Sequence, residues 1–344
     1  MVVMTIPPVH VPVLLEETMQ HLRVQPGGRF IDCTTGLGGH STAIAQAMGE
    51  DGRLLCIDQD SEALEFARTK LAPFGRRVSF VHGNFRELAT LAAAEGFEGL
   101  DGIVMDLGVS SMQFDRSERG FAFGSEGPLD MRMDRTGHGL TAAEIVNTWD
   151  ETSLANLFYT YGEERQSRRI AGSVVRARPL RTTWDLARAV EQAVGGTRGR
   201  NQIHPATKVF LALRIRINGE LDSLETGLPQ AHRLLGFGPT PSHHQKITEN
   251  DEGTGGRLAV ISFHSLEDRI VKQYFRREST NCICPPELPV CRCAHRATLR
   301  EVVHRAIRPS DAEVARNPRA RSAVLRVVER LAEPAANQAA QRGA

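Results

Sequence analysis

A glycine-rich turn and two carboxylates follow the predicted strands in the N-terminal part of this 344-residue chain. The turn, Asp32–Ser41, contains Gly36-x-Gly38 and lies between a predicted strand and a predicted helix. Glycines in such a turn let the backbone reach left-handed conformations and approach a ligand closely. Asp58 ends the second predicted strand and Asp106 ends the fourth. Because ligands of an open parallel sheet bind beyond the carboxyl ends of the strands, these residues predict a single ligand site.

The residue types at this edge predict a nucleoside rather than a dinucleotide. Asp58 can accept both hydroxyls of a ribose, and Phe85, just after Asn84 at the end of the third strand, can lie against an adenine face. A dinucleotide fingerprint would have Gly or Ala at position 41, where this chain has Ser41. The acidic groups suit a ligand with a positively charged sulfur and an amino-acid tail. The alternative, that these are ordinary turn residues of an α/β protein, stays open.

The elements that must hold these residues alternate between strand and helix over the first 106 residues. The predicted strands are Arg29–Cys33, Arg53–Ile57, Val78–His82 and Gly102–Asp106. The predicted helices are Gly39–Met48, Ser61–Leu71 and Phe85–Ala94, with Ser61 as N-cap. This alternation predicts an α/β fold with a parallel sheet covered by helices on both faces.

The alternation stops after Asp106. Leu107–Gly139, rich in Gly, Ser, Asp and Arg, predicts a long functional loop. Only helices are predicted from there to about Arg216, and the main ones are Ala142–Thr148, Thr152–Tyr159, Ser167–Arg176 and Trp184–Val194. A long helix over Ala206–Leu224, a strand over Arg257–Phe263, a helix over Leu266–Arg276 and a strand over Ser322–Glu329 follow. We therefore expect a discontinuous α/β domain over 1–140 and 217–332, a helical insertion over 141–216, and disorder over 236–256 and 333–344.

Nine segments, in one order, resemble the bacterial 16S rRNA cytosine-N4 methyltransferases of the RsmH/MraW family. They are His10–Leu15, Gly36–Ser41, Asp106–Ser111, Arg119–Phe123, Gly127–Asp134, Tyr161–Arg165, His204–Thr207, Ile261–Arg269 and Asn317–Ser322. The resemblance implies a class I, Rossmann-like methyltransferase that depends on S-adenosylmethionine and carries an inserted all-helical domain. It also implies methyl transfer to the exocyclic N4 of a cytosine in the decoding region of 16S rRNA, typically cytosine 1402.

The resemblance also implies a set of cofactor contacts. These are Gly38, Gly39, His40, Asp58, Phe85, Asp106 and Gln113. His40 and Gln113 rest on the resemblance alone, whereas the other residues agree with the strand-end pattern described above.

An exocyclic cytosine amine is a poor nucleophile because its lone pair is delocalised into the ring. The methyl donor is already activated by its positive sulfur, so no catalytic metal is assigned. The enzyme must align the reacting atoms and accept a hydrogen bond from the amine. We expect Asp106 or the following backbone carbonyls to be that acceptor, with Asp130 and His264 as secondary proton acceptors. His264 has an alternative role as a strand-end histidine bonded to backbone.

The aromatic residue that stacks on the target base is not evident. The wider group of amino-methyltransferases commonly has an Asp/Asn/Ser-Pro-Pro-aromatic motif after the fourth strand. This chain has Asp106–Val109 there, without the aromatic residue. Phe121 and Phe123 in the following loop are the candidates.

The net charge of +1 conceals a basic insertion. Arg165–Arg181 and Val194–Gly219 contain no acidic residue. The predicted RNA-binding residues are Arg165, Arg168, Arg169, Arg176, Arg178, Arg181, Lys208, Arg214 and Arg216. Arginine forks suit phosphates, so the two runs favour contact with 16S rRNA or the small ribosomal subunit over merely solvated helix faces.

Four of the six cysteines are close together near the C-terminus. Cys282-x-Cys284 and Cys291-x-Cys293 could hold structural zinc tetrahedrally, although this spacing is tighter than is usual for zinc ligands. His295 is an alternative ligand. The other interpretation is a reduced loop braced by prolines.

The chain has no secretion signal and no stretch long enough to span a membrane, so a cytoplasmic location without a membrane partner is expected. Whether the chain forms a homodimer stays open. A non-catalytic ribosome-assembly factor that keeps the cofactor fold is the main alternative function. An NAD oxidoreductase and a small-molecule methyltransferase are weaker ones.

Overall fold

The computed structural model describes residues 12–195, 204–237 and 255–331, apart from Pro286, Pro289 and Ala294. The chain forms two compact units. The first contains residues 1–108 and 222–344, and the second is Val109–Leu221. The predicted disorder over 333–344, most of 236–256, and the first two residues of the segment His10–Leu15 lie outside the described residues.

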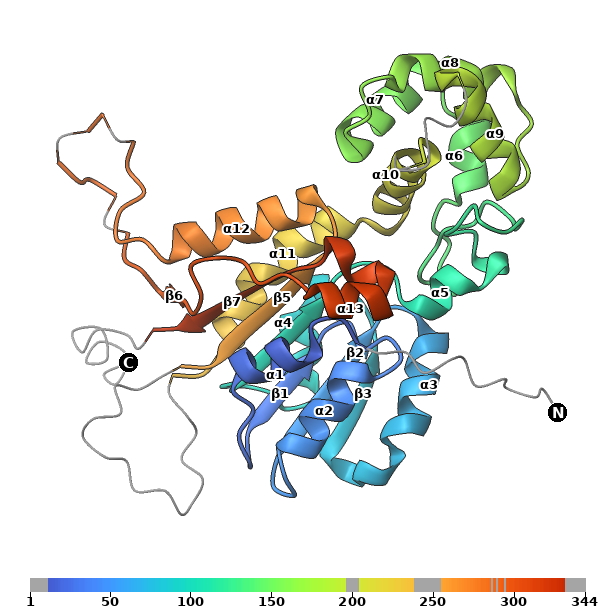
Figure 1. Ribbon diagram of the computed structural model, residues 1–344. Coiled ribbons are helices and arrows are strands. Elements are labelled where there is room, and N and C mark those ends of the chain that lie inside the picture. Colours follow the sequence, from blue (N-terminus) through green and yellow to red (C-terminus); the bar gives the residue numbers. More distant parts are fainter. Residues whose placement is uncertain are drawn as a thin grey trace. The chain divides into compact units, whose positions relative to one another are not determined.

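A seven-stranded sheet forms the centre of the first unit, in the order β3-β2-β1-β4-β5-β7-β6 (Figure 1). Its strands are β1 (Arg29–Asp32), β2 (Arg53–Asp58), β3 (Val78–His82), β4 (Gly102–Asp106), β5 (Arg257–Ser262), β6 (Leu299–Glu301) and β7 (Val324–Arg330). The order reverses at β1, between β2 and β4, and such a reversal opens a crevice at the carboxyl ends of the strands. The predicted α/β class is confirmed.

The last two strands correct the prediction of a purely parallel sheet. β1 to β5 run parallel, but β7 is antiparallel to both β5 and β6. The three residues of β6 are too few to give a clear alternating pattern, so this strand was not predicted. An antiparallel partner needs no crossover helix, so β7 can follow β6 after only short helical turns.

Helices cover both faces of the sheet, because successive strand side chains point to opposite faces. On one face Ile31, Leu55 and Ile103 pack with residues of α4, α11 and α12. On the other, Phe30 and Leu54 pack with residues of α1, α2 and α3. The bounds are α1 (Leu15–Leu22), α2 (Gly39–Ala47), α3 (Ser61–Leu71), α4 (Leu88–Ala94), α11 (Glu220–Leu234), α12 (Ser265–Glu278) and α13 (Asp311–Arg316).

Two helix boundaries differ from the sequence analysis. Asp60, rather than Ser61, caps α3, since its side chain accepts the N–H groups of Glu62 and Ala63. The long helix predicted over Ala206–Leu224 is two helices, α10 (Ala206–Asn218) and α11, separated by Gly219 at φ 59°. A left-handed glycine ends a helix without steric cost, which apolar periodicity alone does not reveal.

The second unit is helical. It contains α5 (Ser111–Asp115), α6 (Ala142–Thr148), α7 (Glu151–Gly162), α8 (Ser167–Arg176), α9 (Thr183–Val194) and α10. The apolar faces of α6 to α10 form one cluster, which also includes Leu129, Met131 and Met133 from the predicted loop. This unit therefore begins at Val109, whereas the sequence analysis began the insertion at residue 141.

The segment Leu107–Gly139 is more ordered than a loop prediction suggests. It contains α5 and a short 3₁₀ helix over Ser117–Arg119. The side chain of Arg119 is only 1% exposed and donates to the carbonyls of Arg132 and Met133. Such a buried guanidinium fixes the path of the backbone around it, since its hydrogen bonds cannot be replaced by water.

Candidate functional site

The glycine-rich turn is tied to the ends of the neighbouring strands. Gly36 and Gly38 have φ values of 51° and 72°, a conformation that favours glycine. The Gly36 N–H donates to Asp58 Oδ2 at 2.7 Å, and the Thr35 N–H donates to the Ile57 carbonyl at 3.0 Å. The turn after β1 is thus held against the end of β2.

Asp58 lies at this junction as predicted. Its second oxygen, Oδ1, accepts the Asp60 N–H at 2.8 Å. Burial raises the pKa of Asp58 to about 7, although these backbone hydrogen bonds lower it. Each oxygen of a carboxylate has two lone pairs, so Asp58 keeps the capacity to accept a further hydrogen bond on each side.

Asp106 ends β4 and has an unsatisfied oxygen. Its backbone N–H donates to Thr34 Oγ1 at 2.6 Å, and its Oδ2 lies 3.5 Å from His40 Nδ1. Its Oδ1 is buried and has no hydrogen-bond partner among the described residues. Burial raises the pKa of Asp106 well above its usual range, with further contributions from the charges of Asp32 and Glu267. A buried acceptor without a donor is costly unless a ligand supplies one.

Asp32, for which no role was predicted, is 1% exposed at the end of β1. Its Oδ2 accepts the Ser41 hydroxyl at 2.6 Å and its Oδ1 accepts the Thr34 N–H at 3.1 Å. Burial raises the pKa of Asp32 to about 6. The hydroxyl of Ser41 therefore binds this carboxylate, which Gly or Ala at that position could not do. The sequence signal for this role was the acidic residue at the start of the glycine-rich turn.

The two residues after Gly38 are constrained by packing within the first unit. A Cβ on Gly39 would lie 2.3 Å from Pro12 Cγ. The His40 ring is 5% exposed, and its Nε2 lies 3.2 Å from the Val13 carbonyl while its Nδ1 faces Asp106. Pro12 thus requires a residue without a side chain at position 39. The His40 ring lies against Asp106 Oδ2.

Phe85 follows β3 but is largely inside the core. It is 9% exposed, and a Cβ on Gly227 of α11 would lie 2.7 Å from its ring. Asn84 accepts the Arg86 N–H and donates to Gln59 Oε1 at 2.8 Å. The contact of Phe85 with adenine stays a prediction, since most of its ring packs on α11.

His264 lies at the end of β5 and caps α12. Its Nδ1 accepts the Glu267 N–H at 3.4 Å. Its Nε2 lies 3.1 Å from Glu267 Oε1, but it is buried and has no hydrogen-bond partner among the described residues. The other oxygen of Glu267 accepts the Phe263 N–H at 2.9 Å. The Nδ1 contact gives His264 a capping role, whereas its unpartnered Nε2 leaves the proton-acceptor role a prediction. Glu267, 3% exposed in its side chain, adds to the acidic groups of this region.

The remaining predicted contacts lie in the second unit. Gln113 Oε1 accepts the Ser110 N–H at 2.9 Å and completes a capping box at the start of α5. Asp130 binds Arg132 through both oxygens, at 2.7 and 3.1 Å, and lies 3.6 Å from Arg135. Hydrogen bonds and charge from Arg132 hold the pKa of Asp130 below its usual value despite partial burial. Such a carboxylate is a weak proton acceptor.

The two aromatic candidates differ in exposure. Phe121 is 5% exposed and belongs to the core of the second unit. The Phe123 ring is partly buried and lies 4.6 Å from the His204 ring and 5.0 Å from the Phe210 ring, measured between centroids. Phe123 is therefore the more accessible of the two.

The basic residues of the insertion fall into two groups. Some are used within the unit: Arg178 donates to the carbonyls of Val146 and Trp149, and Arg214 binds Glu220 through two bonds of 2.7 and 2.8 Å. Lys208 donates to the Glu163 carbonyl, and Arg216 lies over the Trp149 ring. The exposed side chains without such an internal role among these contacts are Arg165, Arg168, Arg169, Arg176 and Arg181.

The strand-end residues of the first unit fit a nucleoside with a positive charge. The left-handed glycine turn follows β1, Asp58 ends β2 with lone pairs available, and Asp106 ends β4 with a buried Oδ1. These strand ends lie where the order of the sheet reverses. Burial raises the pKa of three carboxyls at this edge, and a cationic ligand would favour their charged forms. No helix in the described part of the chain is long and apolar enough to cross a membrane.

Comparison with known proteins identifies the family. The model of the MraW methylase family matches residues 8–331. Among similar proteins, the "Ribosomal RNA small subunit methyltransferase H" of Dehalococcoides mccartyi (strain ATCC BAA-2100 / JCM 16839 / KCTC 5957 / BAV1) is 50% identical over 94% of this chain and 87% of its own. The proteins of the same name from Symbiobacterium thermophilum and Thermomicrobium roseum are 49% and 50% identical, each over 94% of this chain and over 96% and 94% of their own lengths.

These matches cover both units, and they confirm the predicted family, cofactor and fold class. The sheet order, with its antiparallel β7 beside β5, is that of class I methyltransferases. The chain belongs to the MraW methylase family and is an S-adenosylmethionine-dependent methyltransferase.

Proposed function

We propose that this enzyme transfers a methyl group from S-adenosylmethionine to the exocyclic N4 of a cytosine in the decoding region of 16S rRNA, cytosine 1402 in the family. The relatives named as small-subunit rRNA methyltransferases support the RNA substrate. The observation that carries the chemistry is the buried Oδ1 of Asp106 at the carboxyl end of β4, which has no hydrogen-bond partner in the described part of the chain. An acceptor in this state suits an N–H donor such as an exocyclic amine.

The residues that would hold the cofactor come from three strand ends. Gly38 and Gly39 would allow close approach of the ligand to the backbone, Asp58 would accept the ribose hydroxyls, and Phe85 would contact the adenine. The cofactor contact of Gln113, in α5 of the second unit, rests on the family resemblance alone. When bound, S-adenosylmethionine supplies a methyl group already activated by a positive sulfur. The fit is supported by the left-handed turn and by the raised pKa values of Asp58 and Asp106, which a cation would lower.

Asp106 would act on the substrate amine. Its Oδ1 would accept a hydrogen bond from N4 and so stabilise the positive charge that develops on the nitrogen. His40, 3.5 Å from Oδ2, would keep the carboxyl oriented. Asp106 would then take the proton that N4 loses, since its raised pKa makes it a stronger base than an ordinary carboxylate. Asp130 is a weaker candidate, because Arg132 already binds it. His264, whose Nε2 has no hydrogen-bond partner among the described residues, would be the alternative proton acceptor.

The exposed arginines of the second unit would bind phosphates of the rRNA. Arg165, Arg168, Arg169, Arg176 and Arg181 are exposed in that unit. Guanidinium groups bind phosphate oxygens bidentately, and they do so without selecting a base sequence. The target cytosine would have to be unstacked, at a cost of a few kcal/mol. In this role the enzyme would act on the small subunit in the cytoplasm.

Asp106→Asn tests the catalytic assignment. Small subunits from cells that lack this protein are incubated with each variant and S-adenosylmethionine, and mass spectrometry of nuclease digests measures N4-methylcytidine. We expect the rate to fall about 100-fold or more, as when other charge-stabilising groups are removed. Asp51→Asn, an identical change at an exposed turn, should leave the rate unchanged.

The same experiment separates the enzyme from an assembly factor. If the unmodified protein forms no N4-methylcytidine on any subunit preparation while it still binds small subunits, the assembly-factor alternative gains support. Methylation of another atom or nucleotide would overturn the N4 assignment but leave the methyltransferase in place. Full activity of Asp106→Asn would remove Asp106 from the mechanism.

A further inference from the structure

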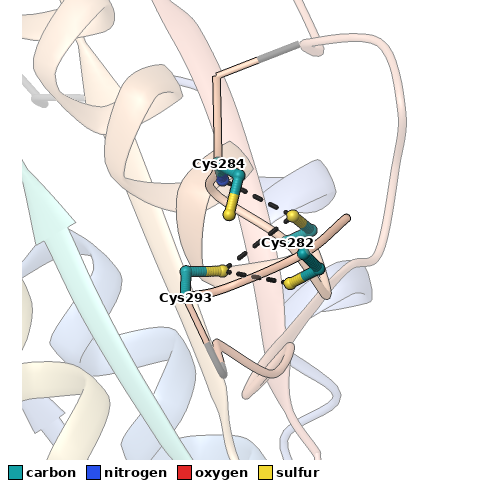
Figure 2. Close-up of side chains that lie close together, drawn as sticks. Cys282, Cys284 and Cys293 are labelled. Carbon is teal, nitrogen blue, oxygen red and sulfur yellow. Dashed lines mark hydrogen bonds between the residues drawn. The ribbon is translucent and has the colours of Figure 1, made fainter. Parts of the chain in front are cut away.

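The loop between α12 and β6 brings four cysteines together. Their four Sγ atoms all lie within 4.8 Å of one another, and the residues are Cys282, Cys284, Cys291 and Cys293. Figure 2 shows three of these side chains directed at one another. The Sγ atoms of Cys291 and Cys293 are 3.6 Å apart, and those of Cys293 and Cys282 are 3.9 Å apart. All four are free thiols in the structure.

These separations match the edges of a zinc–thiolate tetrahedron. With a Zn–S bond of about 2.3 Å, tetrahedral geometry places neighbouring sulfurs about 3.8 Å apart. A disulfide would instead need about 2.05 Å. We propose that Cys282, Cys284, Cys291 and Cys293 bind one Zn²⁺ as a tetrahedral tetrathiolate that folds the loop.

Backbone hydrogen bonds to the sulfurs support thiolates. The Ile283 N–H donates to Cys293 Sγ, the Cys284 N–H to Cys282 Sγ and the Arg292 N–H to Cys284 Sγ, each at 3.4 Å. Neutral thiols are weak acceptors, whereas a tetrathiolate around Zn²⁺ carries a net charge of about −2 that N–H donors stabilise. The C-x-C spacing therefore positions donors as well as ligands.

His295 is not in the ligand set. Its Nε2 lies 3.0 Å from the Arg277 carbonyl at the end of α12, so the ring is engaged at the base of the loop. That base is closed by other bonds as well, from the Thr298 N–H to the Glu278 carbonyl at 2.9 Å and from the Ala297 N–H to Asn281 Oδ1 at 3.1 Å. Zinc would therefore order only the tip, residues 282–293.

The tip needs such a constraint because it has no core. None of its described residues is buried, and its large apolar side chains Ile283, Leu288 and Val290 are 44%, 45% and 69% exposed. A short segment without buried apolar surface is not held in one conformation by packing. Four protein ligands leave no open position on the metal, so the site is structural and takes no part in methyl transfer.

Elemental analysis of the full-length protein, expressed without an affinity tag and purified without chelator, tests the site. We expect a zinc-to-chain ratio of about one. The Cys282→Ser/Cys291→Ser variant should lose at least about 90% of the zinc, because half the ligands are gone. His295→Ala and Cys56→Ala, which change a nearby histidine and a buried cysteine of β2, should keep it.

A second measurement avoids dependence on the folding of the double variant. Zinc is removed from the unmodified protein under reducing conditions and Co²⁺ is added. A tetrathiolate gives intense visible d–d bands and a sulfur-to-cobalt charge-transfer band, and hydrogen exchange at residues 283, 284 and 292 should slow as the metal binds. A chain without zinc and without these bands would overturn the proposal, as would two disulfides by thiol titration. Loss of zinc in His295→Ala would overturn the four-cysteine ligand set.

Discussion

At the scale of single residues, three buried carboxyl groups at adjacent strand ends determine the electrostatics of the site. Asp32, Asp58 and Asp106 all have pKa values raised by burial, and the charge of Asp32 adds to the shifts of Asp58 and Asp106. Burying negative charge without a counter-charge costs free energy, so the ligand-free protein is less stable than its packing alone would allow. A cationic ligand at this edge would recover part of that cost, which links cofactor binding to stability.

Asp58→Asn tests this link through pH. The pKa of Asp58 rises from about 3.8 to about 7 on folding, so its stabilising contribution is full below pH 4 and is lost as the pH rises through 7. The free energy of unfolding of the ligand-free protein should therefore fall between pH 5 and pH 8. In Asp58→Asn that fall should be smaller by about 2 kcal/mol.

Urea unfolding at several pH values measures this slope. Asp51→Asn, at an exposed turn, should keep the slope of the unmodified protein. The variant's slope should not vanish, because Asp32 and Asp106 also titrate with raised pKa values. An unchanged slope in Asp58→Asn would show that this carboxyl does not take up a proton on folding.

At the scale of elements, α11 packs closely against Phe85 in the segment that follows β3. Gly227 lets the helix approach the Phe85 ring, because a Cβ there would lie 2.7 Å from a ring carbon. Glycine inside a helix costs about 1 kcal/mol relative to alanine, so its presence here reflects the contact and not helix propensity.

Gly227→Ala should therefore destabilise the protein by about 1–3 kcal/mol, since overpacking outweighs the gain in helix propensity. Thr226→Ala, one residue earlier on the exposed face of α11, is the matched control and should change stability by less than about 0.5 kcal/mol. Phe85→Leu in the Gly227→Ala background should restore part of the loss. Thermal unfolding measures all three, and an equal or higher melting temperature for Gly227→Ala would show that the ring can move aside.

The elements themselves could mostly be predicted from the sequence. β3 and β4 match the predicted bounds, and β1, β2 and β5 differ from theirs by one residue at the C-terminal end, because apolar runs bounded by turn residues identify buried strands. α1, β6 and α13 were missed, since short segments give too few periods for a pattern. The break at Gly219 was also missed, because two amphipathic helices in succession look like one.

At the scale of the whole molecule, the near-neutral chain carries a basic surface on one unit. Arg168 and Arg169 of α8 are exposed, whereas Arg178 and Arg214, predicted to bind RNA with them, are engaged inside the unit. A count of arginines in the sequence cannot separate these groups. Whether a guanidinium forms a hydrogen bond inside the unit depends on which residues the fold brings next to it.

Arg168→Ala/Arg169→Ala should weaken binding to 16S rRNA and make it less sensitive to salt. If each arginine meets one phosphate, the slope of log K against log salt should fall by about 1.4–1.8. S-adenosylmethionine binding, measured by calorimetry without RNA, should not change. Arg76→Ala, an exposed arginine in the first unit, should leave the slope unaltered. Filter binding across a salt series provides the measurement, and an unchanged slope for the double variant would place the RNA elsewhere.

Local patterns in the chain were enough to establish the family, the α/β class, the cofactor and the turn that begins at Asp32, because each depends on residues a few positions apart. Folding in three dimensions decided the rest. It set β7 antiparallel to β5, bound Asp32 to Ser41 and paired Asp130 with Arg132. Among the described residues it also left Asp106 Oδ1 and His264 Nε2 without hydrogen-bond partners. Hydrogen bonds and burial depend on which distant segments meet, and one-dimensional spacing contains little of that information.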